Sequence, residues 1–386
     1  MPVVLERIPE KRARPPRPVT RRWLISGAAA LITGMGLTLL FWQGERAGPV
    51  FWLFAIVLPV CLWGAMFSAR RAGYKFQRVG QYSANRTIDT RHACARGRGQ
   101  RFAWFAGEYL LNALEQQHMA TQKAAIDKKP VLQPVKPRGV QKPVRHSRLS
   151  GWENAGDVLA SLQEEITGHI NQLLDSLPPA MTCYLALDLA KGLPDLSLSW
   201  LPEIRRPFVR IRDLSGLAIL DYWLDYHYEK PAALLVISVQ LNDVPQNDTG
   251  EAVSVVLMTN CRLKGTPAES TRIHRPQIDN TGDPEHALRH AVLWAGLEKH
   301  TPLRGWITGG TLASAGAMNV ACEVHAPALT ADRFINIDTV AGFAGVAAPW
   351  QALILSTRQC LADREAQMVV TESSPDYRQL CAVTSE

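Results

Sequence analysis

Two uncharged apolar stretches near the start of the chain constrain its fold more than any other feature. They cover residues 23–42 and 50–69, and only seven residues separate them. Each is about the length that a helix needs to cross the hydrocarbon core of a bilayer, roughly 20 residues. The sequence therefore predicts a transmembrane helical hairpin over residues 23–69, with the lipid bilayer as a partner.

Basic residues flank both ends of this hairpin. Residues 1–22 form a basic tail of net charge +5, and residues 70–101 carry +8, while the turn at 43–49 is neutral. Because cationic flanks stay on the cytoplasmic side, we expect a two-pass protein of the bacterial inner membrane with both termini cytoplasmic. The predicted interfacial anchors are the aromatic residues Trp23, Trp42, Phe51, Trp52 and Tyr74.

Other interpretations of this end stay open. The segment Thr20–Leu24 resembles a twin-arginine export signal, although the apolar run behind it is long and a second run follows. Both runs are also long enough for core helices of a soluble protein, although uncharged strings with basic flanks are rare there. Small residues recur every fourth position in the first run, and they either form a packing face for the second helix or simply fill lipid-facing positions. These residues are Ser26, Ala30, Gly34 and Thr38.

The positive charge of the chain is segregated from its C-terminal part. Residues 1–148 carry +18 and residues 149–386 carry −11, which together give the +7 of the whole chain. An acidic body argues against nucleic acid as a partner, and the basic segments are suited to anionic headgroups. The seven cysteines show no paired framework, which indicates a reducing compartment.

Between the hairpin and the acidic body, the pattern predicts two segments. Residues 70–127 form a basic juxtamembrane region, in which Phe102–Ala125 has the apolar periodicity of a helix. Residues 128–148 contain four prolines, seven basic residues and no acid, a composition typical of an extended linker. The body, residues 149–386, is large enough for one substantial core.

Helical and strand patterns alternate through the body. Helices are predicted from Trp152 to about Leu177, over about 213–228, from Pro284 to about Lys299 and over 345–361. Strands are predicted at 181–187, 208–211, 232–239, 252–258, 306–308, 334–337, 367–370 and 379–383. This order predicts an α/β fold with a mixed sheet between layers of helices.

The order of several motifs in the body resembles the thiolase-like β-ketoacyl synthases. Residues 231–238 and 250–257 are similar to that family's paired strands, and 283–297 to the helix that begins its second half. Residues 308–311 and 341–348 fall near its His-Gly-Thr-Gly-Thr and Gly-His-Thr-x-Gly-Ala-Ala-Gly motifs. The resemblance covers about residues 180–386 and implies a thiolase-like layered domain.

The departures from this family are chemical. Its reaction needs a cysteine nucleophile at a strand-to-helix turn and two histidines that act on the thioester and its carboxylate. The matching turn, residues 212–217, has no cysteine, and the histidine positions fall at about Gly309 and Phe343. Neither residue has a side chain that donates a hydrogen bond or moves a proton. The resemblance therefore implies a pseudoenzyme without catalytic residues, cofactor or metal.

Other candidate sites have weak signals. Ser215 at a helix start is a possible nucleophile, but Asp213 and Ser215 fit ordinary helix capping better. Cys322 and His325, or His286 and His290, offer metal ligands without the matching partners that a metal site needs. The small-residue stretch 305–316 lacks the lysine of a P-loop, and we interpret it as a close backbone crossing.

An aromatic and acidic helix in the body is a candidate interaction surface. Aromatic residues are favoured at the centres of protein interfaces. Some of these residues are expected to face the core instead. The candidate surface consists of Asp221, Tyr222, Trp223, Asp225, Tyr226 and Tyr228.

The sequence supports two main functional hypotheses. In the first, the chain is a non-catalytic, membrane-anchored docking or scaffold protein that contacts other membrane proteins or forms homo-oligomers. By general architecture alone, the accessory proteins of bacterial secretion systems, type VI in particular, are built this way. In the second, it is a membrane-associated acyl-transfer or condensing enzyme with displaced residues such as Cys183 or Cys322. A lipid-sensing anchor is a third, weaker possibility.

Overall fold

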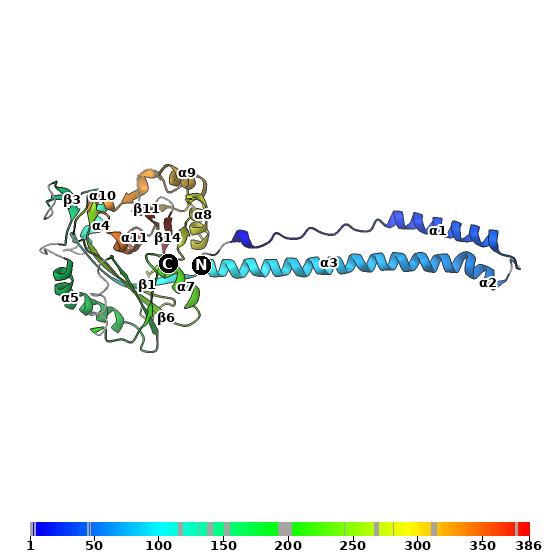
Figure 1. The fold of residues 1–386 in the computed structure, drawn as a ribbon, viewed down its shortest axis with the longest axis horizontal. Coiled ribbons are helices and arrows are strands. Elements are labelled where there is room, and N and C mark those ends of the chain that lie inside the picture. The colour runs from blue at the N-terminus through cyan, green and yellow to red at the C-terminus, as the bar shows by residue number, and fades with distance from the viewer. Residues whose placement is uncertain are drawn as a thin grey trace. The chain divides into compact units, whose positions relative to one another are not determined.

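The computed structural model describes residues 3, 5–44, 46, 48–114, 119–130, 132–136, 142–149, 155–191, 203–242, 244–265, 270–280, 282–309, 315–374 and 377–386. They form two compact units (Figure 1). The N-terminal unit is Val4–Ala95, and the body consists of Met1–Val3 with Arg96–Glu386.

The N-terminal unit contains two helices that are long and apolar enough to cross a membrane, Thr20–Phe41 and Pro49–Gly99. The second helix continues past Ala69, the predicted end of the membrane span, and no proline interrupts it between there and Gly99. It includes a π-helical turn just before Pro59, where the proline ring cannot donate the usual backbone hydrogen bond. The elements are η1 (Leu5–Arg7), α1 (Thr20–Phe41), α2 (Pro49–Trp52), η2 (Leu53–Val57) and α3 (Leu58–Gly99).

The two apolar helices contact each other along their length. The indole Nε1 of Trp63 donates to the carbonyl of Trp23 at 3.0 Å, and the Trp23 and Phe67 rings lie 5.6 Å apart. Gly34 lies so close to the ring of Pro59 that a Cβ at this position would overlap it. Gly34, a member of the small-residue face, therefore lies at a packing contact of the second helix.

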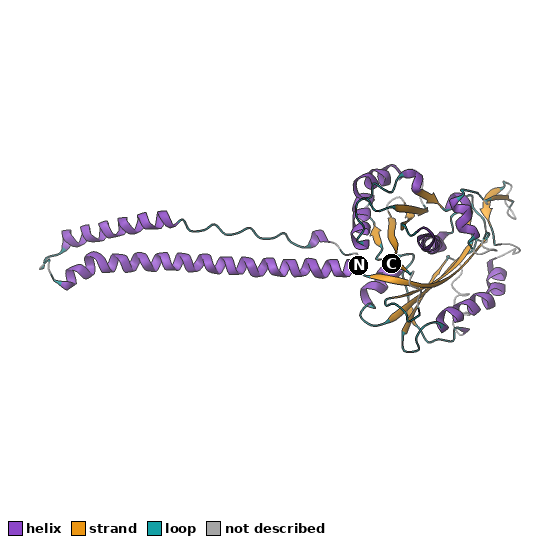
Figure 2. Cartoon of the chain, turned by 180° about the vertical axis from the view of Figure 1, so that it is seen from behind, coloured by secondary structure: helices purple, strands orange, loops and turns teal. Residues whose placement is uncertain are grey.

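The body consists of five layers, with helices on both sides of the strands and between them (Figure 2). Helix α5 covers one outer face and helices α8 and α9 cover the other, while α7 and α11 lie between the two halves of the sheet. The helices are α4 (Ala120–Ile126), α5 (Ala155–Asp175), α7 (Ala218–Tyr226), α8 (Pro284–Ala295), α9 (Ala315–His325), α10 (Asp338–Ala341) and α11 (Ala348–Asp363), with the 3-10 turns η5 (Ala331–Arg333) and η6 (Gly345–Ala347).

One sheet of 11 strands runs through the body, in the order β12-β11-β13-β14-β9-β1-β8-β6-β4-β5 with β10 beside β14. A second sheet has three short strands, β2-β3-β7. The strands are β1 (Phe102–Asn112), β2 (Gln133–Val135), β3 (Val144–Ser147), β4 (Thr182–Leu189), β5 (Val209–Ile211), β6 (Ala232–Gln240), β7 (Thr249–Gly250), β8 (Ala252–Thr259), β9 (Thr271–His274), β10 (Gln277–Asp279), β11 (Leu303–Thr308), β12 (Phe334–Asn336), β13 (Ala366–Ser374) and β14 (Tyr377–Ser385).

The large sheet consists of two halves with the same pairing pattern. In the first half β5 and β6 flank β4 in parallel, and β8 and β1 follow antiparallel. In the second half β12 and β13 flank β11 in parallel, and β14 and β9 follow antiparallel. The halves join where β1 pairs with β9. Helices α7 and α11 hold equivalent places, since each follows the outer strand of its half.

Strand periodicity sorts the core into layers. On β6, Leu234 and Val236 face the central helices, while Leu235 and Ile237 face α5. Because successive side chains of a strand point to opposite faces, a strand covered on both sides reads as one continuous apolar run. The wholly buried run at 232–239 was therefore recognisable as a strand of an α/β sheet.

The predicted helix over Phe102–Ala125 is wrong. Residues 102–112 form strand β1, and among the described residues of the stretch only those of Ala120–Ile126 are helical. The apolar pattern misled because β1 is covered on both faces: Ala103 and Leu110 belong to one core layer, and Tyr109 packs against another.

The predicted extended linker over 128–148 is also wrong for the residues that the structure describes. Strands β2 and β3 lie in this stretch, and β3 pairs with β7 in the body. His146 is buried, at 1% exposure, and Ser147 donates to the carbonyl of Ala341. Composition predicted solvation here, but tertiary contacts bury the end of the segment. Strands β9 and β10 and helix α9 were not predicted.

Candidate functional site

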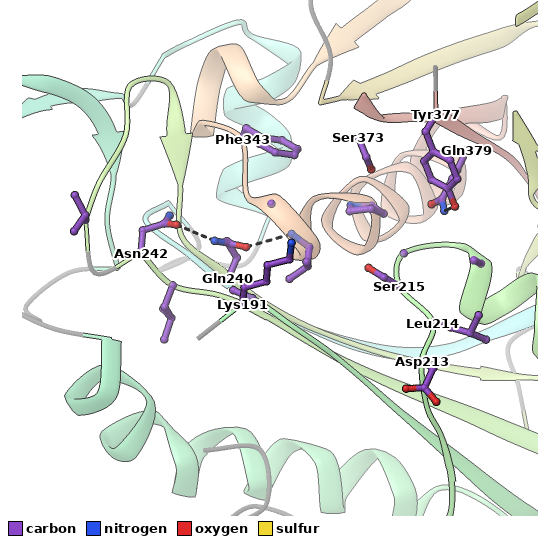
Figure 3. Close-up of a pocket in the computed structure, with 18 residues that line it drawn as sticks. Lys191, Asp213, Leu214, Ser215, Gln240, Asn242, Phe343, Ser373, Tyr377 and Gln379 are labelled. Carbon is purple, nitrogen blue, oxygen red and sulfur yellow. Dashed lines mark hydrogen bonds between the residues drawn. The ribbon is translucent and has the colours of Figure 1, made fainter. Parts of the chain in front are cut away.

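A cavity of about 990 Å³ opens at the carboxyl ends of β4, β6 and β13, and residues from both halves of the sheet line it (Figure 3). The carboxyl ends of parallel strands are the usual place for ligands in α/β folds. The lining residues are Ala190, Lys191, Asp213, Leu214, Ser215, Gly216, Ala218, Gln240, Leu241, Asn242, Val244, Phe343, Gly345, Val346, Pro349, Ser373, Tyr377 and Gln379.

One wall of the cavity is the turn from β5 into α7. Ser215 donates its hydroxyl hydrogen to Oδ1 of Asp188 at 2.8 Å, and the backbone N–H of Gly216 donates to Oδ2 at 2.7 Å. The indole of Trp350 donates to the same carboxylate at 3.0 Å. Burial raises the pKa of Asp188, and these three hydrogen bonds to its charged form oppose that rise.

The turn is shaped by backbone geometry and not by helix capping. Asp213 and Gly216 both have positive φ, at 62° and 58°. The backbone N–H of Leu217 donates to the side-chain oxygen of Gln379 at 2.8 Å. Asp213 and Ser215 do not cap α7, whose N-cap residue is Leu217 without a side-chain cap. The predicted capping role is therefore wrong, and the Ser215 hydroxyl is bound to Asp188 instead.

A comparable arrangement lies at the end of β11 in the second half. Asp338 accepts from the Thr308 hydroxyl at 2.7 Å and from the backbone N–H of Gly309 at 2.6 Å. Burial raises the pKa of Asp338 to about 6, although both hydrogen bonds oppose that rise. In each half, a carboxylate at the end of the central strand accepts hydrogen bonds from a backbone N–H and a hydroxyl: Asp188 at β4 and Asp338 at β11.

No side chain fits at position 309. Gly309 has a φ of +69°, which L side chains rarely adopt. A Cβ there would overlap the carbonyl oxygen of Glu372 and lie 3.3 Å from Cε2 of Phe343. Position 309, next to Phe343, therefore accommodates only glycine.

Proteins similar to this chain are found among solved structures. No protein-family model matches the sequence, and no curated protein matches it either. Among solved structures, 417 chains match.

Three of these matches are ketosynthases. The ishigamide ketosynthase/chain length factor is 13% identical with a TM-score of 0.50, over 73% of this chain and 99% of that one. The ketosynthase from module 1 of the Bacillus amyloliquefaciens FZB42 bacillaene synthase is 9% identical with a TM-score of 0.54, over 75% and 76%. A type II polyketide ketosynthase, solved with its acyl-carrier protein, is 9% identical with a TM-score of 0.52, over 74% and 99%. The body has a thiolase-like ketosynthase fold. At these identities the likeness shows the fold alone.

In this thiolase-like body, three residues from segments that resembled ketosynthase motifs lie near one another. Ser215 and Phe343 line the same cavity, and Gly309 adjoins Phe343. Phe343 reaches the cavity from the segment before α11, and Ser215 from the segment before α7, which hold equivalent places in the two halves (Figure 3).

The cysteines of the thiolase-like body do not reach the cavity. All seven cysteines of the chain are described, and none is a lining residue. Cys183 and Cys322 are each 2% exposed, and burial raises the pKa of each thiol to about 11. Because the thiolate is the nucleophile, both are unreactive core thiols by the criterion of exposure and pKa.

The histidine pairs lie on α8 and α9, away from the lining. The rings of His286 and His290 are 4.3 Å apart on α8, and His290 is buried. His325 lies 3.2 Å from Glu285, while Cys322 belongs to the core under α9. The expected close backbone crossing is found at Gly309, where a Cβ would overlap the backbone of Glu372, whereas Gly305 lies against the side chain of Phe334. Residues 310–314 lie outside the described residues.

The predicted interaction surface on α7 divides into buried and exposed residues. Trp223 is fully buried, and Asp221 and Asp225 bind the buried side chain of Arg275 at 2.7 and 2.8 Å. These three residues are therefore structural. The surface members are Tyr222 and Tyr226, whose rings lie 4.6 Å apart, while Tyr228 is partly exposed beneath the guanidinium of Arg101.

Asp188 and Asp338 were missed in the sequence. Each directly follows a predicted apolar strand, 181–187 and 334–337. A polar residue at the carboxyl end of such a strand is the signal that would have found both.

Proposed function

We propose that the chain is a membrane-anchored docking module whose thiolase-like body binds a partner and does not condense acyl groups. The observation that carries the proposal is the set of residues at the three motif positions. The turn 212–217, which resembles the family's nucleophile turn, has no cysteine, and the two histidine positions fall at about Gly309 and Phe343. A condensing reaction requires a thiolate and proton-donating groups at these places.

Ser215 is a poor replacement for the cysteine. An alcohol needs an adjacent base, and its hydroxyl is bound to Asp188, a carboxylate already held by two other donors. Of the ten histidines nine are described, and none of these nine lines the cavity. The alternative of a displaced cysteine nucleophile is disfavoured by the burial of Cys183 and Cys322.

The proposal includes the membrane arrangement. The helices Thr20–Phe41 and Pro49–Gly99 are proposed to enter and leave one membrane, with the basic flanks and the body on the cytoplasmic side. Protease added outside intact spheroplasts should leave the C-terminal body uncut. Removal of that body would refute the orientation. A role in a bacterial secretion system, type VI included, stays a hypothesis that rests on architecture alone.

The chemical part is tested with the full chain in detergent. Wild type and Ser215→Ala are incubated with acyl-coenzyme A and with acyl carrier protein, and intact mass and peptide mapping detect any acyl adduct. We expect no adduct on either protein. An adduct on wild-type Ser215 that is absent from Ser215→Ala would overturn the proposal.

The docking part is tested by cross-linking in membranes. The exposed pair Tyr222 and Tyr226 is the predicted contact, so Tyr226→Ala should weaken recovery of a stoichiometric partner or of a second copy. Val320→Ala is the matched control, because Val320 is also exposed (61%) but lies on α9. Equal recovery with both variants would remove α7 from the docking surface.

A further inference from the structure

The N-terminal tail is held in a defined register beside α3. The backbone N–H of Arg12 donates to Oδ1 of Asn85 at 2.9 Å, and the Arg12 carbonyl accepts from Gln81 at 2.9 Å and Asn85 at 3.1 Å. Lys11 pairs with Asp89 at 2.6 Å. Because Gln81 and Asn85 are four residues apart, they share one face of the helix and together bind the backbone N–H and the carbonyl of one residue, Arg12.

We call the contact of Arg12 with Gln81 and Asn85 the clamp. The tail runs from the clamp to α1 as an extended loop, and Figures 1 and 2 both draw it alongside α3. Prolines 15, 16 and 18 fix its backbone near the polyproline conformation. Eight residues at about 3.1 Å each span about 25 Å. The facing part of α3, from Arg70 to Arg86, covers about 24 Å at a rise of 1.5 Å per residue.

The tail from Arg12 onward and the part of α3 that faces it contain basic residues and no acidic residues. Residues 12–22 of the tail hold five arginines, and residues 70–86 of α3 hold four arginines and one lysine, with no Asp or Glu in either range. On α3 most of these share one side: Arg71, Lys75, Arg78, Tyr82 and Arg86 follow spacings of 4, 3, 4 and 4. At about 100° per residue they fall within about 80° of the circumference, next to the clamp face. All five are exposed.

We define the basic ribbon as Arg71, Lys75, Arg78, Tyr82 and Arg86 of α3 together with Arg12, Arg14 and Arg17 of the tail. Like charges held this close destabilise their own alignment, so the clamp works against electrostatic repulsion. An anionic partner that lies along both the tail and α3 would remove this repulsion. We propose that the basic ribbon binds an acidic helix of a partner protein.

The spacing and the length select this partner. Carboxylates spaced three and four residues apart on a helix repeat with the same pitch as the ribbon. They would face the cations Arg71, Lys75, Arg78 and Arg86, with the hydroxyl of Tyr82 among them. Anionic headgroups reach only the first turns, because Asn85 lies about 24 Å beyond Ala69, well over the screening length of about 8 Å. A second copy of this unit carries the same charge and is repelled. The proposal does not depend on the cavity or on α7.

The test uses the full chain in nanodiscs of zwitterionic lipid. The probe is a labelled alanine-based helical peptide with five glutamates spaced 4, 3, 4 and 4, and its control is an isomer with the glutamates spread around the circumference. We expect the patterned peptide to bind at least about fivefold more tightly at 100 mM salt, and to weaken as salt rises. Equal affinity for the two peptides would overturn the proposal.

Variants separate the ribbon from general positive charge. Arg78→Glu should weaken binding about tenfold, while Arg91→Glu, on another side of the same helix, should change it less than about twofold. Gln81→Ala with Asn85→Ala keeps every charge but frees the tail, and should weaken binding at least about threefold. Unchanged affinity in this clamp variant, or tighter binding of single-stranded DNA or phosphatidylglycerol vesicles than of the peptide, would overturn the proposal.

Discussion

The hydroxyl of Ser215 donates to the buried carboxylate of Asp188 at an Oγ–Oδ1 distance of 2.8 Å. The same carboxylate accepts from Gly216 and Trp350, so it joins the cavity turn to the central helix α11. A structural role for Asp188 follows, because removing an acceptor that three donors share leaves buried donors without partners.

We therefore expect Asp188→Asn to lower the free energy of unfolding by about 1–3 kcal/mol, since an amide presents a donor where the site needs an acceptor. Ser215→Ala removes one donor only and should cost about 1 kcal/mol or less. Urea unfolding followed by tryptophan fluorescence measures both. A larger loss in Ser215→Ala than in Asp188→Asn would contradict this account.

Gly309 should not tolerate any side chain. Its φ is +69°, and a Cβ would overlap the Glu372 carbonyl, so Gly309→Ala should lower the free energy of unfolding by about 3 kcal/mol or prevent folding. Gly316 in α9 has nothing near its Cβ position, and Gly316→Ala should be neutral or stabilise the protein by up to about 1 kcal/mol. Thermal unfolding of the pair measures the contrast, and similar melting temperatures would be incompatible with it.

Asp338 predicts a pH dependence. Its pKa is raised to about 6 in the folded chain from an ordinary value of 3.8, so between these values the folded state holds a proton that the unfolded state releases. The free energy of unfolding therefore falls as the pH rises from about 4 to 6, and this contribution is flat above. Because the residue keeps partial exposure, we expect a change of about 1–2 kcal/mol.

The comparison with Asp338→Asn isolates this contribution. Denaturant unfolding of both proteins at pH 4, 5, 6 and 7 should give a difference in stability that changes between pH 4 and 6 and then levels off. A constant difference across this range would show that Asp338 titrates normally in the fold.

Thiol labelling should separate the buried cysteines from Cys94. Burial raises the pKa of Cys183 and Cys322 to about 11 and that of Cys360 to about 12, whereas Cys94 is exposed on α3. With N-ethylmaleimide and peptide mass mapping, Cys94 should react first, and Cys94→Ser should abolish that fast phase. Fast labelling of Cys183 or Cys322 would restore the hypothesis of a displaced nucleophile.

The sequence predicted the parts of the fold whose signals are local. The buried run at 232–239 and the helix that begins after Asp283 needed only periodicity and a cap, and Asp283 does accept from the backbone of Glu285 and His286. Strand β1 could not be identified as a strand in this way, because its apolar spacing fits a helix as well as a strand covered on both faces.

The missing catalytic residue types of the site could be predicted from the sequence, but the contacts within the site could not. The sequence alone shows that the turn 212–217 has no cysteine and that positions 309 and 343 have no histidine. The carboxylates that hold this region together are not, since Asp188 meets Ser215 and Trp350 across 27 and 162 residues of sequence. Likewise Asp221 and Asp225 belong to a buried ion network because Arg275 arrives from a distant strand end.

Arg275 is the cation of a buried ion network. Its side chain is 1% exposed and binds Asp221 and Asp225, while Arg98, whose side chain is 53% exposed, binds Asp225 from the surface at 2.9 Å. Burial alone would raise the pKa of Asp225, but the hydrogen bonds and charges of Arg275 and Arg98 hold it well below its usual value. Its stabilising contribution is therefore present above about pH 4 and declines as the pH falls further.

Arg275→Ala removes the buried cation that binds both Asp221 and Asp225, so we expect a loss of about 3–5 kcal/mol in the free energy of unfolding at pH 7. Arg98→Ala removes an exposed partner and should cost about 1 kcal/mol or less. The difference in the free energy of unfolding between the two variants should become smaller as the pH falls from 5 to 3, because protonated carboxyl groups are no longer attracted to the cation. Urea unfolding at these pH values measures it, and a difference that stays constant would mean that Arg275 acts through packing and not through charge.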